Sequence, residues 1–136
     1  MNQERLFLDT VFIQAILNSR DQYHQVAKEF LPRVRNAKEI WVTEAIFMEV
    51  ANALSNYNRE KVIAFIQQCY STDNIFVINI TPQLFQKGLI LYGSRQDKNW
   101  GLVDCISFLV MKEKNLTDAV TSDIHFIQAG FQALLR

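Results

Sequence analysis

The sequence predicts an α/β fold in which a central, mainly parallel sheet of four to five strands is flanked by helices. Short apolar segments rich in β-branched and aromatic residues alternate with segments of helical periodicity, an order typical of parallel sheets with helices on both faces. With 136 residues, the chain can build one hydrophobic core and is too short for two ordinary domains. We therefore expect a single domain over residues 1–136.

Four apolar segments are the expected strands. Each is short and bounded by polar residues or turn formers. The third combines β-branched with aromatic side chains, which suit a pleated, half-buried surface. The expected strands cover residues 5–8, 40–42, 75–80 and 119–121.

Helices are expected between these strands, in the order β-α-α-β-α-α-β-α-α-β-α. Asp21 precedes a helix that Pro32 should kink or end, because proline lacks the N–H that a helix interior needs. Thr43 can cap the next helix, and Thr81 and Pro82 begin another. Further helices should cover residues 11–17, 62–69, 102–114 and 124–129, with a loop over residues 92–101.

Two of these helices should each bury one apolar face, since their apolar residues recur at helical spacing. The expected buried side chains are Tyr23, Val26, Ala27, Phe30 and Leu31 on the first, and Leu84, Phe85, Leu89 and Leu91 on the second.

Composition limits the location and the kind of partner. Lys plus Arg and Asp plus Glu number 14 each, which neither indicates nor excludes nucleic-acid binding, because an acidic pocket can lie beside a basic rim. No apolar run reaches the roughly 20 residues that span a bilayer, and the polar residues 2–5 do not begin a signal peptide. We expect a cytoplasmic protein without membrane association, in which Cys69 and Cys105 are buried free thiols.

Four acidic residues stand among apolar neighbours: Asp9, Glu49, Asp104 and Asp123. Removing a carboxylate from water is costly unless a cation compensates for the lost hydration. Ligands of open α/β sheets bind outside the carboxyl ends of the strands, where four distant segments can bring these acids together. Hard cations such as Mg²⁺ and Mn²⁺ need oxygen ligands of this kind. The acids therefore predict a metal site at one edge of the sheet.

Each acid also has a structural interpretation. Asp9 and Asp123 could cap helices, Asp104 could stabilise a helix N-terminus, and Glu49 could pair with an arginine. Taken together these interpretations require four independent coincidences, so we favour the joint functional one.

The acids lie in motifs that occur in the order of a known family. These are LDT at residues 8–10, TEAIFMEVANAL at 43–54, DKNWGLVDCISF at 97–108 and TSDIHF at 121–126. The chain resembles PIN domains, and among them the VapC-type toxin ribonucleases. One departure is Val103, where many relatives carry Ser or Thr, which removes an expected hydrogen bond beside the site.

The resemblance implies a Mg²⁺- or Mn²⁺-dependent endoribonuclease that hydrolyses RNA phosphodiester bonds as the toxin of a type II toxin–antitoxin pair. It implies that the four acids are catalytic and bind the metal, with Asp9 and Asp104 as core ligands completed by Glu49 and Asp123. A metal ion would activate water for attack at phosphorus. A small antitoxin and a homodimer are the partners that it implies.

Four other residues are expected to contact the substrate. Thr10 and Thr121 match hydroxyl positions beside the site, where they would orient water or an acid. Arg95 and Lys98 lie in the loop that leads to the third acid and would bind phosphates. In the same loop, Asp97 would either pair with one of these cations or supplement the metal site.

Aromatic and imidazole groups near the motifs are less informative. Trp100 would either stack on a base or anchor its loop in the core. His24 is expected on a helix surface, whereas His125 follows Asp123 closely enough to face a substrate. Since the metal would do the chemistry, we assign neither histidine a catalytic role, and Phe126 is expected in the core.

Two other functions are compatible with part of the sequence. A non-catalytic PIN-like module that binds RNA or protein is the main alternative, although the presence of all four acids argues against lost activity. A phosphatase of the haloacid dehalogenase kind also places an Asp after its first strand. That chemistry needs a second Asp two residues later, where this chain has Val11.

Overall fold

The computed structural model describes residues 3–136, so residues 1 and 2 of the polar N-terminal segment lie outside it. Its centre is a five-stranded sheet with the order β3-β2-β1-β4-β5, and all four strand pairs are parallel. This confirms the predicted fold class. The strands are β1 (Arg5–Leu8), β2 (Glu39–Thr43), β3 (Ile75–Ile78), β4 (Asp118–Val120) and β5 (Gln132–Ala133).

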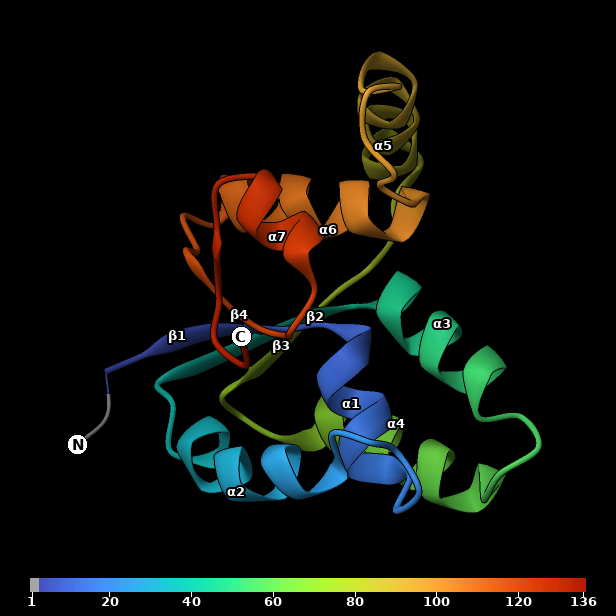
Figure 1. Ribbon diagram of the computed structural model, residues 1–136, viewed down its shortest axis with the longest axis vertical. Coiled ribbons are helices and arrows are strands. Elements are labelled where there is room, and N and C mark those ends of the chain that lie inside the picture. The colour runs from blue at the N-terminus through green and yellow to red at the C-terminus, as the bar shows by residue number, and fades with distance from the viewer. Residues whose placement is uncertain (1–2) are drawn as a thin grey trace.

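Helices cover both faces of the sheet, as Figure 1 shows: α1, α2 and α4 lie on one side, and α6 and α7 on the other. The element order matches the expected one, with β5 added in the C-terminal segment. In the described part of the chain, no helix has the length and apolar character needed to cross a membrane. The helices are α1 (Thr10–Leu17), α2 (His24–Arg35), α3 (Glu44–Ala53), α4 (Arg59–Ser71), α5 (Pro82–Ser94), α6 (Leu102–Glu113) and α7 (Ile124–Gln128).

The second helix differs from its prediction at both ends. Its start lies beyond Asp21, because Asp21 Oδ1 accepts the N–H of Tyr23 at 2.8 Å and forms a turn before the helix. The helix then continues past Pro32 to Arg35, so of the two alternatives, a kink or an end at Pro32, the end is wrong. The carbonyl of Pro32 accepts the N–H of Asn36 at 3.1 Å, which maintains the last turn.

A cluster of aromatic rings packs helices α6 and α7 against the central strand β1. Phe126 is fully buried, and its ring centre lies 6.3 Å from that of Phe7 and 5.0 Å from that of Phe108. Trp100 packs edge-on against Phe108 at 5.0 Å and donates its Nε1–H to Gln128. Trp100 therefore anchors its loop, and the start of α6 and the whole of α7 are held against β1.

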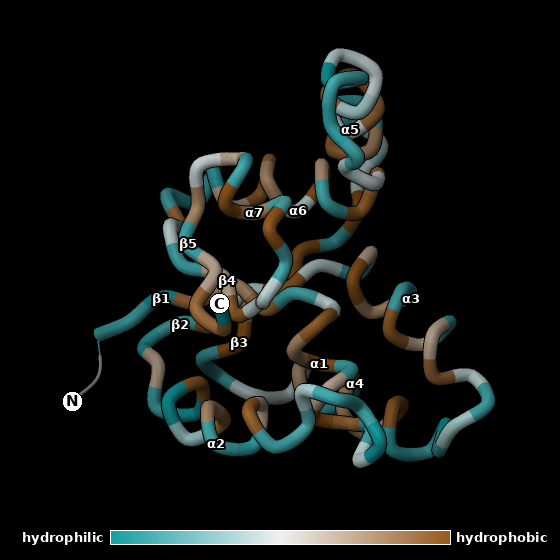
Figure 2. Tube along the Cα trace, viewed as in Figure 1, coloured by the Kyte–Doolittle hydropathy of each residue, from teal (hydrophilic) through white to brown (hydrophobic). Residues whose placement is uncertain are grey.

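Apolar side chains on two helices are more exposed than their spacing predicted. On α2, Val26 is 46% exposed, whereas Ala27 is buried. On α5, Phe85 is 41% and Leu89 is 40% exposed, because this helix packs mainly on α6 and extends beyond the sheet (Figure 1). Figure 2 shows hydrophobic positions along this projecting helix. Cys69 and Cys105 are buried free thiols, as predicted.

Helix α5 approaches α6 through Gly88. A Cβ atom there would lie 2.8 Å from Cγ1 of Ile106, a buried branched side chain that has little room to move. At Gly93, also in α5, a Cβ atom would meet nothing within 4 Å.

The two glycines allow a matched test of this packing. Gly88→Val should lower the free energy of unfolding by about 1–3 kcal/mol, because it overpacks the contact between α5 and α6. Gly93→Val should change it by less than about 0.5 kcal/mol. Urea denaturation measures both, and equal stabilities for the two variants would contradict the packing described.

Candidate metal centre

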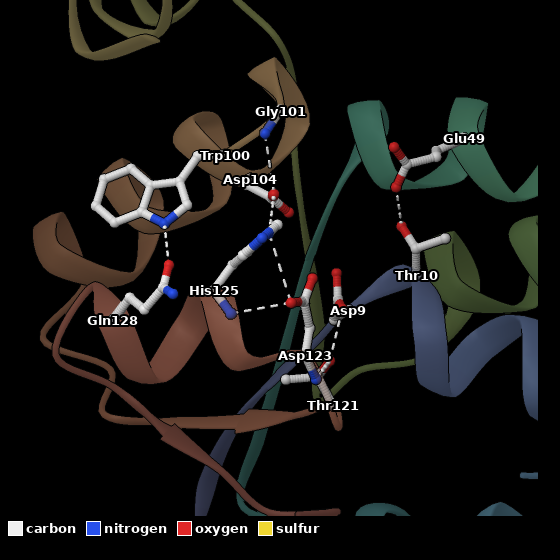
Figure 3. A network of polar contacts seen from close by, with 10 residues as sticks. All are labelled: Asp9, Thr10, Glu49, Trp100, Gly101, Asp104, Thr121, Asp123, His125 and Gln128. Atoms are coloured by element: carbon white, nitrogen blue, oxygen red, sulfur yellow. Dashed lines mark hydrogen bonds and ion pairs between the residues drawn. The ribbon is translucent and has the colours of Figure 1, made fainter. Parts of the chain in front are cut away.

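Three of the predicted acids meet at the carboxyl edge of the sheet. Asp9 directly follows β1, Asp123 follows β4 and caps α7, and Asp104 lies in the first turn of α6. Figure 3 shows their side chains directed toward one region. The three acids are close enough to interact electrostatically, since the charges of Asp104 and Asp123 raise the pKa of Asp9.

Asp9 is the most deeply buried of these acids, with 4% of its surface exposed. Burial is the main cause that raises its pKa from 3.8 to about 7, and the two neighbouring carboxylates add to the increase. A hydrogen bond from Thr121 and one from the backbone of Thr10 act in the opposite direction. No side-chain bond from Asp9 caps α1, so the helix-cap interpretation does not account for its position.

Thr121 holds two of the acids in place. Its hydroxyl donates to Asp9 Oδ2 at 2.7 Å and accepts the backbone N–H of Asp123 at 3.0 Å. The residue is fully buried, so in this structure it orients an acid and does not face a substrate.

Asp104 and Asp123 combine a helix-end contact with a place in the site. Asp104 Oδ2 accepts the N–H of Gly101 at 3.1 Å, and Asp123 Oδ1 accepts the backbone N–H of His125 at 2.9 Å. Both acids therefore have the helix-end contacts that their structural interpretation predicted. Burial raises the pKa of Asp104, while the bonds from Gly101 and His125 lower it in part.

Glu49 lies apart from the other three acids and is exposed to solvent. Its Oε1 accepts a hydrogen bond from the Thr10 hydroxyl at 2.5 Å, which is the contact the structure gives it in place of an arginine. The apolar neighbours suggested a buried carboxylate, but they face elsewhere on α3: Val50 points into the core and Met48 is 59% exposed. Glu49 is thus at the rim of the site, as Figure 3 shows.

His125 is the site residue that sequence reasoning undervalued. Its Nδ1 lies 3.0 Å from Asp104 Oδ2 and 3.5 Å from Asp123 Oδ1. The sequence feature that indicates this position is the place of His125 in the first turn of a helix capped by Asp123. A side chain in that turn is directed back over the cap. The other histidine, His24, contacts the carbonyl of Ala15 at 2.7 Å.

The loop before α6 reaches the site through Gly101, and its basic residues are engaged differently. Arg95 forms two bonds of 3.0 Å to the carboxylate of Asp97, which is the local pair that the sequence allowed for that acid. Lys98 is half-buried. Within residues 3–136, no ion pair joins Arg95 or Lys98 to Asp9, Asp104 or Asp123.

The arrangement fits a divalent cation. Asp104, Asp123 and His125 can each offer one ligand atom, and these atoms lie within 4.8 Å of one another. A cation there would also offset the repulsion that raises the pKa of Asp9. Oxygen and imidazole ligands of this kind bind Mg²⁺, Mn²⁺ and related ions.

Sequence and structure comparisons agree with this fold. Residues 6–132 match the model of the PIN domain, so the chain belongs to the PIN domain family. A similar solved structure is the VapC20 toxin of Mycobacterium tuberculosis, described as cleaving the sarcin–ricin loop. It shares 21% identity, with a TM-score of 0.81 over 93% of this chain and 96% of that one. This likeness establishes the shared fold. No curated protein matches the chain.

The raised pKa of Asp9 predicts that the metal-free protein loses stability as the pH rises. Between pH 3.8 and about 7 the folded state holds a proton that the unfolded state releases. The free energy of unfolding therefore falls as the pH rises through this window. Asp9→Asn removes this titration and should be more stable than the wild type at pH 8, by on the order of 1–4 kcal/mol.

Urea denaturation with chelator present, from pH 4 to pH 8, measures this difference. Asp73→Asn is the matched control, because Asp73 is an exposed acid in a turn outside the site. It should retain the wild-type pH dependence. Identical pH profiles for Asp9→Asn and the wild type would contradict the strong burial of Asp9.

Proposed function

We propose that this protein is a Mg²⁺- or Mn²⁺-dependent endoribonuclease that hydrolyses RNA phosphodiester bonds as the toxin of a type II toxin–antitoxin pair. The observation that carries the proposal is the convergence of Asp9, Asp104 and Asp123 at the carboxyl edge of a PIN domain. The fold shared with a toxin described as cleaving the sarcin–ricin loop supports the choice of RNA. Such a toxin would act in the cytoplasm, where its substrate and antitoxin occur.

In this mechanism the acids bind and orient, while the metal supplies the reactivity. Asp9, Asp104 and Asp123 would hold the cation, and Thr121 keeps Asp9 oriented through its 2.7 Å bond. When bound, the ion would activate water and stabilise charge on the phosphate. Glu49, which accepts the Thr10 hydroxyl at the rim, would complete the pocket.

Substrate contacts are proposed for the loop before α6 and for the rim. Arg95 forms an exposed pair with Asp97, and such pairs contribute little stability, so a phosphate could take over the guanidinium at small cost. Lys98 adds a second cation, and Thr10, which is 7% exposed, donates its hydroxyl to Glu49 at the rim. Together they would guide the RNA backbone toward the acids.

A homodimer is proposed from the projecting helix α5. Phe85, Leu89 and Tyr92 recur at helical spacing and are 41%, 40% and 50% exposed. Contiguous apolar side chains on a surface typically mark a contact with another protein. A second copy of the chain would cover this face.

The antitoxin is proposed to bind on the opposite side of the sheet from α6. An apolar cavity of about 380 Å³ lies there between α1, α2 and α4, lined mainly by aliphatic and aromatic side chains. Arg35 and Lys61 also line it. An apolar segment carrying an acidic residue would match this combination.

A non-catalytic PIN-like module that binds RNA or protein is the alternative. The nuclease needs a metal ion and the module does not. A metal ion that binds the folded state raises its stability, so the two functions can be distinguished by melting temperature. Mn²⁺ should raise the melting temperature of the proposed nuclease at pH 8, and an unchanged melting temperature would favour the module.

Nuclease activity is tested with structured RNA in the presence of Mg²⁺ or Mn²⁺. Asp9→Asn and Asp104→Asn should each reduce the cleavage rate by about 100-fold or more, because each removes a charge that holds the ion. Asp73→Asn should cleave at the wild-type rate, since it lies outside the site. Cleavage that survives both site substitutions would refute the proposed mechanism.

The dimer is tested by sedimentation equilibrium. The wild type should have the mass of two chains of 15.8 kDa, and Leu89→Glu should shift it toward the monomer, because it introduces a charge into the apolar face. Ile63→Glu is the control, since Ile63 is a 54% exposed apolar residue on α4. A dimer that persists in Leu89→Glu would exclude this face as the interface.

A further inference from the structure

Asp104 and Asp123 do not need the imidazole of His125 to hold their carboxylates in place. Both acids beside its imidazole are already held by backbone N–H groups: Asp104 by Gly101, and Asp123 by the main chain of His125. The imidazole is therefore not needed to orient either carboxylate. Its side chain is 25% exposed and points from α7 into the space between them, as Figure 3 shows.

The distances around Nδ1 match those between neighbouring ligands of one metal ion. Two ligands about 2.1 Å from an ion lie about 3.0 Å apart at right angles and about 3.4 Å apart in a tetrahedron. The distances from Nδ1 are 3.0 Å to Asp104 Oδ2 and 3.5 Å to Asp123 Oδ1. The shorter one is also an ordinary hydrogen-bond distance, but the longer one is at the limit of a useful hydrogen bond, and both fit the edges of a coordination shell.

We propose that His125 is a nitrogen ligand of the metal, binding through Nδ1 together with Asp104 and Asp123. The inference rests on the metal dependence of the proposed function and adds an imidazole to an otherwise acidic site. Ligation requires that the imidazole be neutral, with its proton on Nε2.

A mixed nitrogen and oxygen site has a consequence for metal choice. Mg²⁺ prefers oxygen ligands and keeps several waters, whereas imidazole suits transition ions. His125 should therefore favour Mn²⁺ and Co²⁺ over Mg²⁺.

The test is electron spin-echo spectroscopy of the full chain loaded with Mn²⁺ alone. A directly bound imidazole gives modulation from ¹⁴N, which should be replaced by a ¹⁵N pattern when the protein carries ¹⁵N-histidine. His24→Asn should retain the ¹⁴N signal, because it leaves His125 as the other histidine of the chain. Labelling the wild type keeps the test independent of whether a variant folds.

Calorimetry with each metal gives a second readout. His125→Asn keeps an N–H donor near the position of Nδ1 but loses the nitrogen lone pair, so Mn²⁺ should bind on the order of tenfold more weakly. Mg²⁺ affinity should change by less than about threefold.

The outcomes separate this inference from the proposed function. Bound Mn²⁺ without histidine modulation, or equal losses for Mn²⁺ and Mg²⁺ in His125→Asn, would overturn the ligand assignment and leave the nuclease proposal standing. Absence of Mn²⁺ binding to the wild type would overturn both.

Discussion

A carboxylate buried at the end of the central strand is the constraint on which the rest of the site depends. Asp9 is 4% exposed, and burial together with two nearby carboxylates raises its pKa to about 7. The hydrogen bond from Thr121 opposes this only in part. Three acids gathered so closely are costly without a counter-ion, and a divalent cation is the group that would stabilise all of them in their ionised form.

The sheet brings these groups together through its register. β1 lies between β2 and β4, and Leu8 pairs with Val120, so the residues that follow the two strands, Asp9 and Thr121, emerge side by side. The aromatic contacts around Phe126 then hold α6 and α7 against β1. Packing in the core thus determines where the acids of the two helices lie.

The order of helices and strands along the chain could be predicted from the sequence, and so could the acids that follow strands, because both depend on local patterns. The placement of Asp9 and Asp123 at one edge follows from the parallel arrangement. The exposure of Glu49 and the projection of α5 depend on which face a neighbouring element covers, and a single sequence does not contain that information. The place of His125 follows from the direction of one short helix, which only the assembled fold determines.

We expect the acidic edge of this PIN domain to bind a divalent cation. Anomalous diffraction from crystals grown with Mn²⁺ tests it most directly. A strong anomalous peak enclosed by Asp9, Asp104 and Asp123 is expected. A map with no peak at this edge, recorded at saturating Mn²⁺ with all three carboxylates ordered, would contradict it.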